Sequence, residues 1–135
     1  MKVKIISVPV SDQAKAFAFY TEKLLFVKKQ DVEFDDGNRW LTVVSPDALD
    51  GPEVLLEPAP LSFEPTKTYQ KAVFEAGIPW TQFDVEDCQK EYDRLVELGV
   101  EFFTEPEEMG PVKIATFNDT CGNRIQIVEG LSDER

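Results

Sequence analysis

The sequence predicts an α+β domain built from two βαβββ modules, whose curved mixed sheets surround a shared concave pocket. The main observation is a repeat: residues 5–12, I-I-S-V-P-V-S-D, are echoed by residues 80–87, W-T-Q-F-D-V-E-D. Each copy is an apolar strand that ends in Val-x-Asp and leads into a helical pattern. Neither module is large enough to bury its own sheet face, so the two should pack around a common space, which is the natural ligand site.

The first module is expected to span residues 1–58. Ser11 or Asp12 is placed to cap its helix, and the D-D-G-N sequence at 35–38 has the turn chemistry of a hairpin. The expected elements are a strand at 3–10, a helix with the apolar face Phe17, Tyr20 and Leu24, and strands at 26–34, 40–44 and 53–57.

The second module is expected to span residues 78–130, after a linker with a helix at 59–77 and before a short polar tail at 131–135. Closely spaced prolines mark the linker, and Gly77 and Gly99 are placed to end helices. The expected elements are a helix at 67–76, a strand at 80–85, a helix capped by Asp87 with the apolar face Cys88, Tyr92, Leu95 and Val96, a segment at 100–104 that pairs with or edges the sheet, an acidic loop at 105–111, and strands at 112–117 and 124–129.

Composition excludes several classes of function. With 26 acidic and 14 basic residues the net charge is −12, which makes nucleic acid and anionic membranes poor partners. Solubility is a better explanation of this charge than electrostatic steering of a cationic ligand. No run of about 18 apolar residues and no signal-peptide core is present, so a cytoplasmic protein is expected. The chain has no His, which excludes Ser–His and Cys–His nucleophiles and leaves Cys121 without an activating base.

Six short segments point to a known superfamily. They are V-S-D at 10–12, A-F-Y at 18–20, L-L-F at 24–26, V-E-D at 85–87, L-V-E-L-G-V at 95–100 and N-D-T-C-G-N-R-I-Q-I-V-E at 118–129. Together they resemble the vicinal oxygen chelate superfamily, which includes glyoxalases, bleomycin-resistance proteins and extradiol dioxygenases. The resemblance spans nearly the whole chain and implies the fold of that superfamily, while one scaffold hosts many different reactions.

The resemblance also implies where a metal ion would be bound. Metal enzymes of the superfamily place one ligand on the first strand and one on the last strand of each module. In this chain those positions fall on Ile5, Leu55, Trp80 and Gln126. Only Gln126 carries an atom that binds metals, and a metal site needs about three protein ligands, so neither a metal nor another cofactor is expected.

The expected ligand-binding pocket is lined by Ile5, Trp40, Leu55, Glu57, Trp80, Gln82 and Gln126. For Trp40, packing in the core is an equal alternative, and Glu57 is either a pocket residue or an exposed strand end. The first hypothesis is a metal-independent, homodimeric protein that binds a small molecule, as in the bleomycin-resistance branch. The alternative is a lyase or isomerase of glyoxalase type, with Glu57 as general base and Gln126 polarising a carbonyl group. An extradiol dioxygenase is excluded because its iron site needs His.

Overall fold

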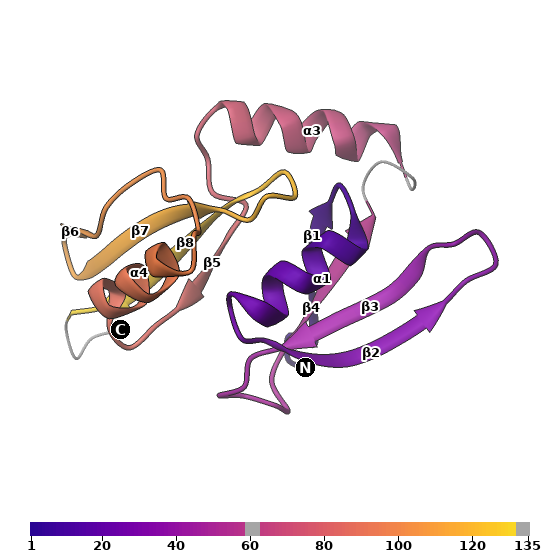
Figure 1. The fold of residues 1–135 in the computed structure, drawn as a ribbon, viewed down its shortest axis with the longest axis horizontal. Helices are drawn as coiled ribbons and strands as arrows, with labels where there is room; N and C mark the ends of the chain where they lie inside the picture. The colour runs from indigo at the N-terminus through magenta and orange to yellow at the C-terminus, as the bar shows by residue number, and fades with distance from the viewer. Residues whose placement is uncertain (59–62, 132–135) are drawn as a thin grey trace.

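The repeated sequence forms two four-stranded mixed sheets in the computed structural model, which describes residues 1–58 and 63–131 (Figure 1). Sheet A has the strand order β1-β4-β3-β2 and sheet B the order β5-β8-β7-β6. In each sheet the first strand of the module pairs in parallel with the last strand, and the other pairs are antiparallel. The predicted fold class, α+β with two βαβββ modules, is confirmed.

The first module follows the predicted order closely. Asp12 caps the first helix, because its carboxylate accepts a hydrogen bond from the backbone N–H of Lys15 at 3.0 Å. Gly37 adopts a φ of +87° in the hairpin turn, a conformation that glycine adopts without strain. The elements are β1 (Ile5–Val10), α1 (Gln13–Glu22), β2 (Val27–Glu33), β3 (Arg39–Val44) and β4 (Glu53–Pro58).

The second module repeats this plan after a connecting helix that lies across the top of both modules in Figure 1. Asp87 caps its module's helix by accepting a hydrogen bond from the backbone N–H of Lys90 at 3.0 Å. The elements are α3 (Glu64–Glu75), β5 (Thr81–Asp84), α4 (Cys88–Glu97), β6 (Glu107–Met109), β7 (Val112–Asn118) and β8 (Arg124–Gly130). No helix in the described ranges is long and apolar enough to cross a membrane.

The structure corrects the predicted edge of sheet B. The acidic segment at 105–111, expected as a loop, contains strand β6, which turns into β7 through Gly110 at a φ of +62°. The segment at 100–104 lies along the edge of sheet B, as expected, although it forms only an isolated bridge between Phe102 and Phe117 and no named strand. The backbone N–H of Phe103 donates to the carbonyl of Thr116 on β7 at 2.8 Å, and the N–H of Asn118 donates to the carbonyl of Glu101 at 2.9 Å. The glycine turn decides the pairing, because it places the residues just before it in register with β7.

The connecting helix also begins earlier than predicted, at Glu64 rather than at residue 67. Pro65 lies in its first turn, where a missing backbone N–H costs no helical hydrogen bond. Part of the expected linker, residues 59–62, and the tail at 132–135 lie outside the described residues.

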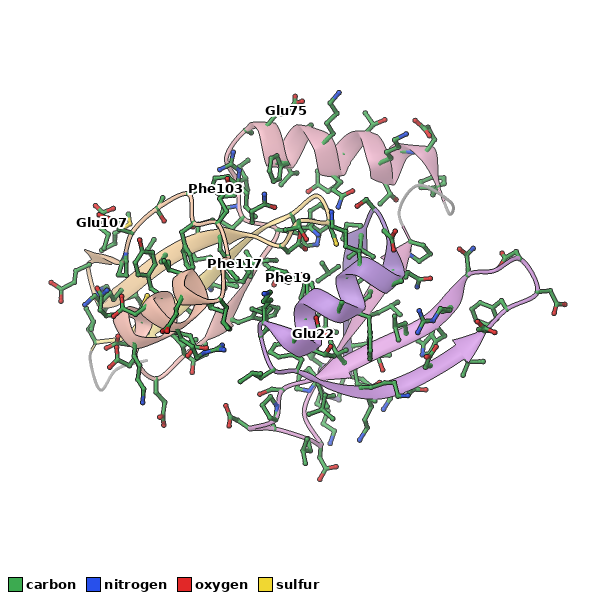
Figure 2. The ribbon with its side chains drawn as sticks, in the orientation of Figure 1. Phe19, Glu22, Glu75, Phe103, Glu107 and Phe117 are labelled. Carbon is green, nitrogen blue, oxygen red and sulfur yellow. The ribbon has the colours of Figure 1, made fainter. Side chains whose placement is uncertain are left out.

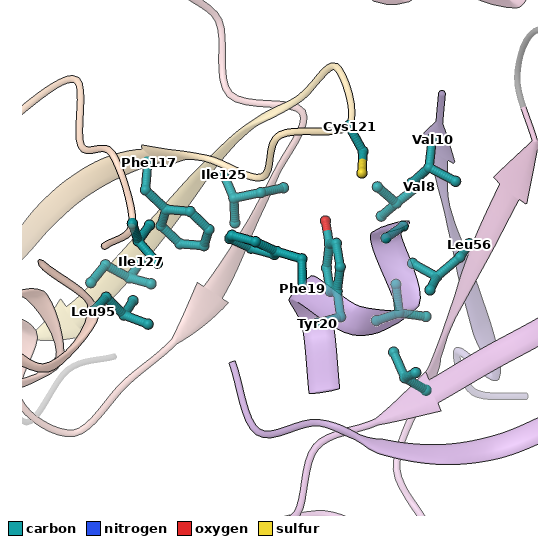
Figure 3. Close-up of a cluster of buried hydrophobic side chains, with 14 of the residues drawn as sticks. Val8, Val10, Phe19, Tyr20, Leu56, Leu95, Phe117, Cys121, Ile125 and Ile127 are labelled. Atoms are coloured by element: carbon teal, nitrogen blue, oxygen red, sulfur yellow. The ribbon is translucent and has the colours of Figure 1, made fainter. Parts of the chain in front are cut away.

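One hydrophobic core joins the two modules. Helix α1 contacts sheet A and α4 contacts sheet B, and the inner faces of both sheets contribute to the same cluster. Figure 3 shows Phe19 extending from α1 toward Phe117 and Ile125 of sheet B, and the ring centroids of Phe19 and Phe117 lie 6.0 Å apart. We call the opposite side of each sheet its outer face.

Packing against two sheets changes the buried stripe of α1. The predicted apolar face is only partly correct: Tyr20 is fully buried, whereas Phe17 and Leu24 are half-buried. Ala16 and Phe19 are buried instead, because α1 faces sheet B as well as sheet A. In α4, Cys88 and Leu95 are buried as expected, but Val96 is exposed.

A buried network of hydrogen bonds, the junction network, ties the modules together. Its centre is Asp119, in the turn between β7 and β8, whose carboxylate accepts hydrogen bonds from the Tyr20 hydroxyl at 2.9 Å and the Asn123 side chain at 2.8 Å. The same carboxylate accepts from the backbone N–H groups of Cys121 and Asn123, at 2.8 and 3.0 Å. Burial raises the pKa of Tyr20 well above its ordinary value, and the Asp119 charge adds to this effect.

The network continues to the free edge of β1. The carbonyl oxygen of Pro9 accepts hydrogen bonds from the side chains of Asn123 at 2.7 Å and Gln70 at 2.8 Å. Pro9 has no backbone N–H, which suits a strand at the edge of a sheet. The edge of β1 is therefore covered by side chains from α3 and the second module.

Candidate functional site

The outer face of sheet A brings together the site residues predicted in the first module. Alternation along the strands places Ile5 of β1, Leu55 and Glu57 of β4 and Trp40 of β3 on the side away from the core. All four side chains are half-buried. Trp40 is absent from the core cluster, so its position agrees with the outer-face alternative rather than with core packing.

The outer face of sheet B carries a pair of amides. Gln82 of β5 lies directly opposite Gln126 of β8 in the parallel ladder. The amide N–H of Gln126 donates a hydrogen bond to the side-chain oxygen of Gln82 at 2.7 Å. No hydrogen bond within residues 1–58 and 63–131 engages the Gln82 amide N–H groups or the Gln126 carbonyl oxygen, so the pair presents both a donor and an acceptor.

Trp80 occupies the boundary between the modules rather than the middle of an open surface. Its indole N–H donates to the backbone carbonyl of Ser7 on β1 at 3.3 Å. Its ring packs edge-on against Tyr69 of α3, with centroids 5.4 Å apart, and also contacts the core cluster. Trp80 therefore helps to hold β5 beside β1, while the exposed Tyr69 extends the aromatic surface toward solvent.

The residues at the superfamily's metal positions do not fit a metal ion. Ile5, Leu55 and Trp80 offer no lone pair, and Gln126 alone supplies an amide oxygen. Within residues 1–58 and 63–131, no three His, Cys, Asp or Glu side chains gather closely enough to hold a metal.

Glu57 is accessible to solvent, as a general base must be, but it is not bonded to the residue expected to work with it. It lies opposite Pro9 on the outer face and remains half-accessible to solvent. None of the hydrogen bonds in the described part of the chain joins Glu57 to Gln126, the residue expected to polarise a carbonyl group.

Sequence reasoning missed Glu53, a carboxylate on the same face. It is the first residue of β4, lies opposite Ile5, and is only 4% exposed. The hydroxyl of Thr42 and, to a lesser degree, the amide of Gln30 donate to Glu53 and hold its pKa below the usual value. The alternation of E-V-L-L-E at 53–57, which places Glu53 beside Leu55 and Glu57, is the signal that could have identified it.

Arg124 and Cys121 are both held inside the structure by their neighbours. Arg124 is stacked between Phe103, at 4.0 Å from the ring centroid, and Phe74, at 4.8 Å, and its Nε donates to the Phe74 carbonyl at 2.8 Å (Figure 2 places Phe103 beneath α3). Cys121 is buried, and burial raises the pKa of its thiol to about 11. The thiol is therefore protonated near neutral pH and unsuited to nucleophilic attack.

Two shallow hollows lie away from the predicted site. One, of about 320 Å³, is lined by residues around the start of α1 and the β2–β3 turn, including Asp12, Gln13 and Arg39. The other, of about 480 Å³, lies on α3 beside Lys67 and Lys71. Neither is lined by a residue of the expected pocket.

Comparisons with known proteins agree with the fold and identify a superfamily and a similar bacterial protein. The sequence profile of the Glyoxalase/Bleomycin resistance protein/Dioxygenase superfamily matches residues 2–127. The uncharacterised protein YurT of Bacillus subtilis (strain 168) is 55% identical over 129 residues, which cover 96% of this chain and 99% of YurT.

Solved structures show the same architecture. The crystal structure of UcmS2 has a TM-score of 0.81 and 31% identity and covers 96% of this chain and 98% of UcmS2. TnmS3, described as an antibiotic binding protein from Streptomyces sp. CB03234, has a TM-score of 0.72 and 28% identity, with 96% of each chain covered.

Proposed function

Since this chain belongs to the Glyoxalase/Bleomycin resistance protein/Dioxygenase superfamily, we propose that it binds a small organic molecule on the outer faces of its two sheets, without a metal ion. The observation that carries the proposal is the set of residues at the superfamily's metal positions. Ile5, Leu55 and Trp80 replace ligands with apolar side chains, and Gln126 pairs with Gln82. Such a surface suits a flat or amphipathic molecule that makes apolar contacts and a few hydrogen bonds.

The similarity to TnmS3 supports a binding function. That protein is described as an antibiotic binding protein, and its structure aligns with nearly the whole of this chain. The aromatic side chains Trp40, Trp80 and Tyr69 supply stacking surface on and beside the outer faces. On this proposal, the chain holds a ligand and leaves it unchanged.

We further propose that the chain acts as a homodimer. Ile5 and Leu55 are half-buried apolar side chains on the face of sheet A opposite the core cluster, and no helix in the described part of the chain is among the main contacts of β1 on that face. A second copy that contributed the outer face of its sheet B would cover them and close a pocket. Light scattering should then give twice the chain mass of 15.3 kDa, and a monomer would count against the assembly.

The alternative is an enzyme of glyoxalase or lyase type that uses Glu57 as its base. It is favoured by one observation, the position of a half-accessible carboxylate on the same face as Leu55. Turnover of a hemithioacetal that disappears in the Glu57→Gln variant would support this alternative.

A thermal-shift screen separates the classes of ligand. We expect aromatic drug-like molecules to raise the melting temperature by several degrees at concentrations well above Kd, because a ligand that binds only the folded state stabilises it by mass action. Zn, Ni and Mn ions should give no comparable shift. A clear shift with one of these metals that is lost on changing Gln126 or Glu57 would overturn the metal-free proposal.

A further inference from the structure

The carboxylate of Glu53 is positioned as a fixed acceptor at the base of the proposed binding face. It lies opposite Ile5 and two residues before Leu55 on the same side of β4, a separation of about 7 Å along the strand. Its side chain is nine-tenths or more buried by its neighbours in sheet A. A ligand on Ile5 and Leu55 would therefore be within reach of this group.

The two oxygens of Glu53 have different surroundings. Oε1 accepts two short hydrogen bonds, from the Thr42 hydroxyl at 2.6 Å and the Gln30 amide at 2.7 Å. These bonds fix the orientation of the carboxylate and favour its charged form. Oε2 lies 3.7 Å from the ammonium group of Lys4, which is beyond hydrogen-bond distance. The charge of Lys29 also acts on this carboxylate.

The Lys4 contact shows what kind of group can reach Oε2. The Lys4 side chain is 80% exposed and the Glu53 side chain only 5%, so a cationic group attached to an exposed chain reaches the buried carboxylate from the solvent side. An ion pair with such an exposed lysine contributes little and is easily displaced. The Lys4 ammonium thus occupies a position that a cationic nitrogen of a bound molecule could take.

We infer that Glu53 selects ligands that carry a positively charged nitrogen next to an apolar or aromatic body, with the apolar part on Ile5 and Leu55. The inference rests on the proposed binding function and adds the charge of the ligand to it.

A pair of probes that differ only in charge tests this inference. N-methylacridinium is a permanent cation, and acridine is uncharged at mildly alkaline pH, while both have the same ring system. Fluorescence titration should show that the wild-type protein binds the cation about tenfold more tightly, as expected for a charge-assisted contact. The preference should decrease as salt is added.

Three variants locate the effect. Glu53→Gln should remove the preference, whereas Glu22→Gln, which removes an equal charge from α1 on the other side of sheet A (Figure 2), should keep it. Lys4→Met should raise affinity for the cation about two- to fivefold, because a competing ammonium group is lost. The lysine variant leaves the bonds of Glu53 to Thr42 and Gln30 intact, so it tests the inference even where Glu53→Gln folds poorly.

The outcomes separate this inference from the proposed function. Binding of acridine without a preference for the cation, a preference that survives Glu53→Gln, or no gain in Lys4→Met would overturn the role of Glu53 alone. Absence of binding by either probe would count against both the inference and the proposed function for flat aromatic ligands.

Discussion

Replacing Asp119 with alanine is expected to lower the free energy of unfolding by about 3 to 5 kcal/mol. The carboxylate accepts four buried hydrogen bonds, and its removal leaves the Tyr20 hydroxyl, the Asn123 amide and two backbone N–H groups without this acceptor. Each buried donor left unpaired costs about 1 to 3 kcal/mol, reduced where neighbours relax. Urea denaturation followed by circular dichroism measures the loss.

Two milder variants serve as controls for Asp119→Ala. Tyr20→Phe removes one hydrogen bond and should cost about 1 to 2 kcal/mol. Asp119→Asn keeps an oxygen that can accept from the backbone N–H groups of Cys121 and Asn123. Its loss of stability should therefore lie between those of Tyr20→Phe and Asp119→Ala. A loss below 1 kcal/mol in Asp119→Ala would show that the junction network does not hold the modules together.

The Asn variant also has a consequence for pH dependence. Burial raises the pKa of Asp119 above its unfolded value of 3.8. The stability gained from its protonation is fully present below that unfolded value and is lost as pH rises through the folded pKa. As pH rises through this acid range, the free energy of unfolding should therefore fall less in Asp119→Asn than in the wild-type protein.

Replacing Gly122 with alanine is expected to cost about 2 to 4 kcal/mol. Gly122 has a φ of +102°, where a Cβ atom is strained, and that atom would lie 2.7 Å from Nε2 of Gln70. The Gln70 amide lies within hydrogen-bond distance of the carbonyls of Pro9 and Cys121 and of the Asn123 side chain, so it cannot move aside without losing bonds. The same denaturation experiment gives the value.

Gly37→Ala is the matched control for Gly122→Ala. Gly37 has a similar φ of +87°, but a Cβ atom there would meet nothing within 4 Å. It should cost only about 1 kcal/mol, from the backbone conformation alone. Equal losses in the two variants would mean that the contact with Gln70 contributes nothing, and the added change Gln70→Ala should recover part of the loss in Gly122→Ala.

The repeat in the sequence was sufficient to predict most of the fold. Val-x-Asp at 10–12 and 85–87 located two strand ends and two helix caps, and both caps are confirmed. Strand β6 was missed because E-E-M has little β-propensity, and its pairing depends on the Gly110 turn and on β7. Phe19 was missed because α1 contacts two sheets, which periodicity along one helix cannot reveal.

The arrangement of the candidate site could be predicted only in part. Strand alternation predicted that Leu55 and Glu57 share a face of one strand, and they do so in β4. The sequence placed Gln82 and Gln126 in the same pocket as these residues, whereas the two glutamines pair with each other in sheet B. The contacts of Trp80 with Ser7 and Tyr69 depend on how three elements meet, which a linear pattern does not encode. The role of these residues in binding remains a prediction.

The most direct test of the binding proposal is a residue-by-residue map of where an aromatic ligand binds. Backbone amide chemical shifts recorded by NMR during titration with N-methylacridinium, after treatment with a chelator, provide it. We predict that the largest changes fall on β1, β3, β4, β5 and β8, around the residues that define the outer faces: Ile5, Trp40, Leu55, Gln82 and Gln126. Changes confined to the hollow at the start of α1 or to the exposed side of α3, or no changes until a metal ion is added, would contradict the proposal.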